Sequence, residues 1–157
     1  MSNFIGFSAG SFATNASYSN FVGQFAGDNA IYANNSNFFG VGTGSGAVNA
    51  SYSNFIGDSA GINAIDANYS VFIGTGAGSG AINATRSSFI GVNAGAGAIG
   101  ASRSIFIGNS AGVNDKVVNG KDTWSILIGD NTSTGDDGAG LGFTNSIVIG
   151  AYATNTA

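Results

Sequence analysis

Residues 53–69 read SNFIGDSAGINAIDANY and form a unit of 17 residues that recurs along the chain. The motif Ser-x-apolar-apolar-Gly begins each unit, and its closing glycines are separated by six intervals of 17 residues and then two of 21. These glycines are Gly6, Gly23, Gly40, Gly57, Gly74, Gly91, Gly108, Gly129 and Gly150. Self-similarity at a fixed short period indicates a repeat architecture.

Each unit contains two short segments rich in Ile, Val and Phe, such as 54–56 and 64–67, separated by Gly, Asn and Ser. Such segments are strand candidates. A unit of this size cannot bury its own apolar face, so successive units must stack at about 4.8 Å per rung. The sequence therefore predicts an all-β fold, a parallel β-solenoid (β-roll or β-prism) of nine rungs with 17 to 21 residues each.

The whole chain, 1–157, is expected to be a single solenoid domain. Regular rungs occupy 2–103, longer rungs with loops occupy 104–145, and a partial closing rung occupies 146–157. The longer rungs include Asn119-Gly120, which signals a hairpin turn, and the Gly-rich segment 130–144. Seven of the twelve charges lie there, Asp115 and Asp130 among them. These loops either project and bind a ligand or close the end of the solenoid.

Composition excludes several functional classes. Gly contributes 27 residues and 43% of the chain is hydrophobic, whereas Pro, Cys, His and Glu are absent. Without His or Cys there is no imidazole or thiolate chemistry, and no cofactor and no enzymatic activity are predicted. Four basic residues against eight acidic ones argue against a nucleic-acid partner, which requires clustered Lys and Arg. No apolar run is long enough for membrane insertion, and no signal peptide is recognised.

The repeated strand has two apolar positions that face opposite ways. Side chains alternate along a strand, so Asn54 and Ile56 point to one face and Phe55 to the other. Because a slender solenoid has one interior, a second apolar stripe of nine large residues requires another chain to cover it. We therefore predict an obligate oligomer. The residues assigned to its core and interface are Phe4, Phe21, Phe38, Phe55, Phe72, Phe89, Phe106, Ile56, Ile73, Ile90, Ile107, Ile128 and Ile149.

The position before each repeat Ser is rich in aromatic and arginine side chains. It reads Tyr18, Asn35, Tyr52, Tyr69, Arg86, Arg103, Trp124 and Asn145. Equivalent positions on adjacent rungs stack about 5 Å apart, which predicts a ladder of rings and guanidinium groups on one edge. This ladder either seals a corner of the rod or stacks on the sugar rings of a receptor. The candidate receptor-binding residues are Tyr52, Tyr69, Arg86, Arg103 and Trp124.

The unit resembles the F-I-G-x-x-A-G repeat of bacteriophage tail fibres and related fibrous adhesins. It is also similar, more distantly, to the S-x-A-I-G-x-x-A head repeat of trimeric autotransporter adhesins. The resemblance covers essentially the whole chain. It implies a homotrimer of β-solenoid chains on a virion or a bacterial cell surface, which spans distance and binds a glycan or another surface receptor.

Other functions find less support in the residues. Asp130, Asp136 and Asp137 are candidate Ca²⁺ ligands, but they match neither the EF-hand loop nor the calcium-binding nonapeptide, so no metal is predicted. A polysaccharide-cleaving tailspike needs two acids about 5 to 9 Å apart, for which only these residues qualify. An ice-binding solenoid needs regular Thr rows, whereas Thr is sporadic here.

Overall fold

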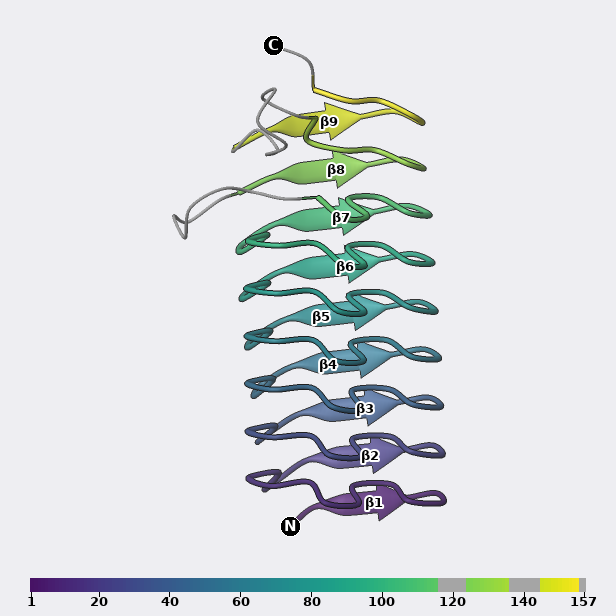
Figure 1. Cartoon of the computed structure of the whole chain (residues 1–157), viewed down its shortest axis with the longest axis vertical. Helices are drawn as coiled ribbons and strands as arrows, with labels where there is room; N and C mark the ends of the chain where they lie inside the picture. Colours follow the sequence, from purple (N-terminus) through teal and green to yellow (C-terminus); the bar gives the residue numbers. More distant parts are fainter. Residues whose placement is uncertain (116–123, 136–144, 156–157) are drawn as a thin grey trace.

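The computed structural model describes residues 1–115, 124–135 and 145–155, and the described chain is a rod of stacked coils (Figure 1). Each coil contributes one strand of three residues to a single parallel sheet, in which the strands lie in chain order. The strands are β1 (Asn3–Ile5), β2 (Asn20–Val22), β3 (Asn37–Phe39), β4 (Asn54–Ile56), β5 (Val71–Ile73), β6 (Ser88–Ile90), β7 (Ile105–Ile107), β8 (Ile126–Ile128) and β9 (Ile147–Ile149). This arrangement confirms the predicted all-β parallel solenoid.

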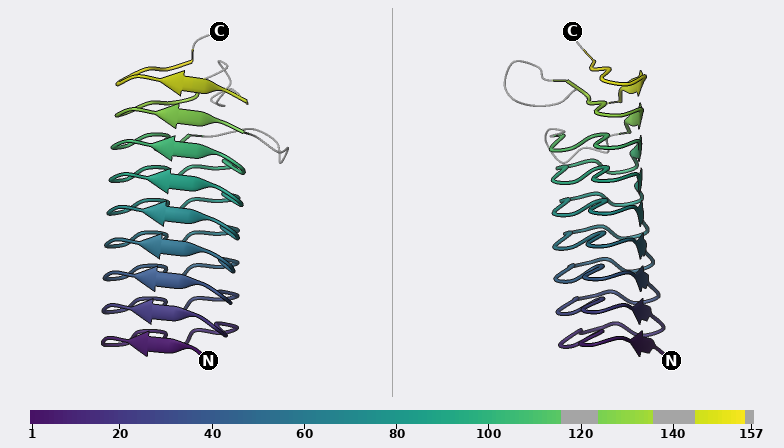
Figure 2. Two further views of the ribbon diagram at one scale, coloured as in Figure 1. Left: turned by 180° about the vertical axis from the view of Figure 1, so that it is seen from behind. Right: turned by 90° about the vertical axis from the view of Figure 1, so that its right-hand side faces the viewer.

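The sheet forms one wall of the rod, and turns form the rest of each coil (Figure 2). Identical repeat positions pair across the sheet, for example Phe55 with Phe72 and Ile56 with Ile73. The second predicted strand is reduced to single paired residues: Ile65 bridges Val48 and Ile82. Asn63 and Asp66 on either side of Ile65 have left-handed φ values of 54° and 56°, so extended backbone cannot continue there.

Left-handed residues bend each coil repeatedly. In the coil that follows β4, Gly57, Ser59, Gly61, Asn63 and Asp66 all have positive φ, and Tyr69 follows with a φ of 60°. Only two of these positions require glycine for space. A Cβ atom on Gly57 would lie 2.6 Å from the carbonyl oxygen of Gly74, and one on Gly61 would overlap the ring of Phe55. The remaining positions accept Asn, Ser and larger residues.

The core is a column of phenylalanine rings inside one chain. Rings of successive coils stack with centroids 4.6 to 4.8 Å apart and planes within 8° of parallel. Leu127 and Val148 continue the column through β8 and β9, and buried alanines such as Ala60, Ala64 and Ala67 line the rest of the interior. The phenylalanines predicted for a shared core are therefore, from Phe21 to Phe106, fully buried by their own chain.

A second column of buried serines lies beside the rings. The Oγ of Ser53 donates to the carbonyl oxygen of Ala67 at 2.6 Å and accepts from the backbone N–H of Ser70 at 3.1 Å. The same pair of bonds recurs at Ser36 and Ser70. The repeat Ser thus ties each strand to the end of its own coil and to the next coil. In the sequence it stood out only as the first letter of the motif.

Candidate ligand-binding ladder

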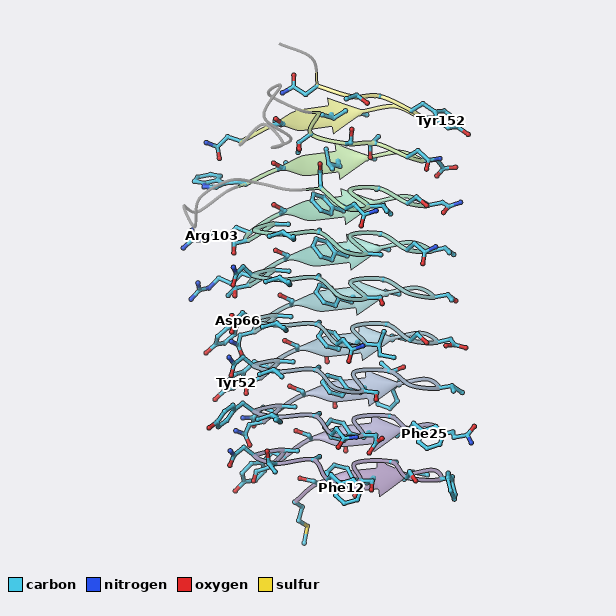
Figure 3. All side chains as sticks on the ribbon, viewed as in Figure 1. Phe12, Phe25, Tyr52, Asp66, Arg103 and Tyr152 are labelled. Atoms are coloured by element: carbon cyan, nitrogen blue, oxygen red, sulfur yellow. The ribbon has the colours of Figure 1, made fainter. Side chains whose placement is uncertain are left out.

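The residue before each repeat Ser lies on one edge of the rod. Since Ser53 and Ser70 point inward, Tyr52 and Tyr69 before them lie outside, at left-handed φ values of 60°. Figure 3 shows Tyr52 and Arg103 on the same edge, with Phe25 and Tyr152 on the opposite one. We call Tyr52, Tyr69, Arg86, Arg103 and Trp124 the ladder.

The first three residues of the ladder form one continuous stack. The rings of Tyr52 and Tyr69 are 5.0 Å apart and inclined by 2°, and the guanidinium carbon of Arg86 lies 5.5 Å from the centroid of the Tyr69 ring. The stack leaves much of each ring in solvent, because Tyr52 is 53% exposed and Tyr69 55%. Neighbouring rings therefore order one another without filling the surface that a ligand would need.

The last residue of the ladder borders a hollow. Trp124 is 65% exposed, and with Ile126, Asn145 and Ile147 it lines a volume of about 330 Å³. Asn145 occupies the ladder position of the next coil, and its Oδ1 accepts from the backbone N–H of Trp124 at 3.2 Å. An exposed indole beside a fixed amide and two apolar side chains suits the apolar face and the hydroxyl groups of a sugar ring.

The ladder also carries the positive charge of this region. The formal net charge of the chain is -4. Within 1–115, 124–135 and 145–155, Arg86 and Arg103 are the only lysine or arginine side chains, and both are exposed. Two adjacent rungs therefore present guanidinium groups on an otherwise acidic protein.

The outer face of the sheet is flat and carries no charge. Its first column has the amides of Asn3, Asn20, Asn37 and Asn54, each joined to the next by a hydrogen bond of 2.8 Å from Nδ2 to Oδ1. Val71 and Ser88 follow, and then isoleucine in β7 to β9. The second column contains the predicted interface isoleucines, which are 36 to 67% exposed from Ile56 to Ile149. One chain alone thus leaves this apolar column in solvent.

Asp115 is placed differently from the expectation for a charged loop. It is buried at the end of the regular coils, where its carboxylate accepts from the backbone N–H and the Oγ1 of Thr134. Burial raises the pKa of Asp115, and the two hydrogen bonds from Thr134 oppose that shift. A position occupied by Ala98 in the preceding coil signalled this burial through the 17-residue period.

The remaining loop candidates are only partly described. The Oδ1 of Asp130 accepts from the backbone N–H of Asn109 at 3.1 Å. Asp136, Asp137 and the predicted hairpin at Asn119-Gly120 lie outside the described residues. In the part of the chain that the structure describes, no three acidic or other metal-ligating side chains gather at one point. Nor does that part contain a helix with the length and hydrophobicity needed to cross a membrane.

Comparisons of the chain with protein-family models, with curated proteins and with solved structures found no match.

Proposed function

We propose that this chain is a rod-shaped segment of a phage tail fibre or bacterial cell-surface adhesin, and that its ladder binds a receptor glycan. The observation that carries the proposal is the exposed stack of Tyr52, Tyr69 and Arg86. Aromatic faces bind the C–H faces of sugars, and parallel rings at regular spacing offer several such faces along one line. The sequence resemblance to tail fibres and adhesins supports the same role.

The rod suits multivalent binding. Because every coil is tied to its neighbours by the sheet, the ring column and the serine column, the ladder side chains keep a fixed spacing of about 5 Å per rung. Repeated weak contacts on one rigid body raise the overall affinity without any strong single site. A rod of this kind also holds its binding edge away from the particle that carries it.

The proposed assembly is a homotrimer. A purely parallel sheet is normally covered on both faces, and here the chain covers only one. The uncharged outer face with its exposed isoleucines is larger than a scattering of single apolar residues, which favours burial against further copies. Three chains around the rod axis would triple the number of ladders.

Glycan binding is tested on a glycan panel with the full chain. Tyr52→Ala and Trp124→Ala should each weaken binding about tenfold, since one base or sugar ring stacked on an aromatic side chain contributes on the order of 1–3 kcal/mol. Tyr152→Ala is the matched control, because Tyr152 is an exposed tyrosine on the opposite edge (Figure 3). Binding that survives both ladder substitutions would assign the ladder a structural role only.

Assembly is tested by native mass spectrometry and light scattering at micromolar concentration. We expect a trimer that Ile73→Asp dissociates, because the substitution places a charge in the apolar column of the outer face. Val92→Asp is the control: Val92 is similarly exposed, but it follows Gly91 at the far end of the strand wall. A folded wild-type monomer would contradict the proposed trimer.

A further inference from the structure

We infer that the glycan bound by the ladder is acidic, with a sugar carboxylate held by the guanidinium groups of Arg86 and Arg103. This inference rests on the proposed function and names its ligand class. A ladder made for neutral sugars needs only rings and amides. This ladder instead changes from rings at Tyr52 and Tyr69 to guanidinium groups on the next two coils, and returns to a ring at Trp124.

Arg86 is ordered for such a contact. Its guanidinium lies over the ring of Tyr69, which is itself stacked on Tyr52. A planar guanidinium held on an aromatic face loses little further freedom when it forms paired hydrogen bonds to a carboxylate. No carboxylate among the described residues forms an ion pair with Arg86, so its charge is available to a ligand.

The acidic residues near this edge are engaged or distant. Asp66 belongs to the preceding coil, and its Oδ1 accepts from the Nδ2 of Asn49 at 2.7 Å. Asp58 adjoins Ser59, which has the coil position of Phe25 on the opposite edge (Figure 3). Charges separated by more than about 8 Å are largely screened at physiological ionic strength. The local field at the ladder is therefore set mainly by its own two arginines.

The order of the rungs gives a direction to the bound chain. A sugar on Tyr52 and Tyr69 would bind through its apolar face, and the next would place its carboxylate at Arg86 and Arg103. A further sugar would reach Trp124 and the hollow beside Asn145. Three kinds of contact in series match a polymer or oligosaccharide with an acidic sugar flanked by neutral faces.

The experiment compares matched pairs of immobilised glycans that differ only in the acid. Suitable pairs are sialylated and desialylated oligosaccharides, uronic acid polymers and their methyl esters, and sulfated polymers as a third arm. We expect the wild-type chain to bind a carboxylated member at least tenfold more tightly than its neutral partner, with an advantage that shrinks in high salt. Preference for sulfated polymers over every carboxylated probe would overturn the assignment of a carboxylate.

Two variants locate the effect. Arg86→Gln should remove about tenfold of the affinity for the carboxylated glycan and leave affinity for the neutral partner within about twofold. Asp58→Asn changes the net charge by one unit at the opposite edge and should leave the ratio unchanged. Equal binding of both members of every pair would overturn this inference while the proposed function stands. Failure to bind any glycan would overturn both.

Discussion

The ring of Phe55 fills the space that a Cβ atom on Gly61 would occupy, within the same coil. The same relationship joins Phe72 to Gly78 and Phe89 to Gly95. Each coil thus contains a large buried ring and, six residues later, a glycine with a left-handed φ near 64° that leaves room for the ring. The two positions can be occupied only as a pair, which explains why F-I-G and A-G recur together.

Gly61→Ala should destabilise the protein far more than Gly80→Ala. Both glycines have a φ of 64°, so each substitution carries the strain of left-handed alanine, about 1–2 kcal/mol. Only Gly61 adds a clash with Phe55, worth about 1–3 kcal/mol more, because no heavy atom lies within 4 Å of the Cβ position at Gly80. Urea unfolding at equal protein concentration measures the difference, and equal losses would show that the coil relaxes around the ring.

Ser53→Ala should lower the free energy of unfolding by about 1–3 kcal/mol for each buried group that it leaves unpaired. The affected groups are the carbonyl oxygen of Ala67 and the N–H of Ser70. Ser125→Ala provides the control, because the buried Oγ of Ser125 has no hydrogen-bond partner. We expect that control to be neutral or slightly stabilising in thermal and urea unfolding. A similar cost for both variants would mean that filling the space, rather than hydrogen bonding, is what the serine column provides.

Asp115→Asn should change how stability depends on pH. Burial raises the pKa of Asp115 in the folded chain above the value of about 3.9 that aspartate has when unfolded. As pH falls from neutral through the raised pKa, the folded chain binds a proton before the unfolded chain does, so the wild type gains stability relative to the variant. The gain levels off once pH falls below the unfolded value.

The pH experiment compares urea midpoints of wild type and Asp115→Asn from pH 7 to pH 3. Asparagine keeps an acceptor for the N–H and Oγ1 of Thr134, so the variant should fold. A wild type that instead loses stability relative to the variant on acidification would show that the charged form of Asp115 is favoured in the folded chain.

Much of the fold follows from the period and from strand alternation. Seventeen residues with one apolar pair are too few to bury themselves, so stacking of units was predictable, as was the placement of Phe55 and Ile56 on opposite faces. The second strand was predicted wrongly, because apolar composition around Ile65 does not reveal that Asn63 and Asp66 adopt left-handed backbone. The burial of Asp115 was missed because its charge was given more weight than its repeat position.

The sequence by itself determined the rung length, the strand register and the column to which each side chain belongs, since a fixed period places equivalent residues one above another. Only the tertiary structure decided which columns face inward. The turn at Gly61 encloses the phenylalanines and leaves the isoleucines outside, and the left-handed backbone at Tyr52, Tyr69 and Arg86 turns the ladder out to solvent. Those choices depend on where the coil closes, which is a property of many backbone angles together and of no single motif.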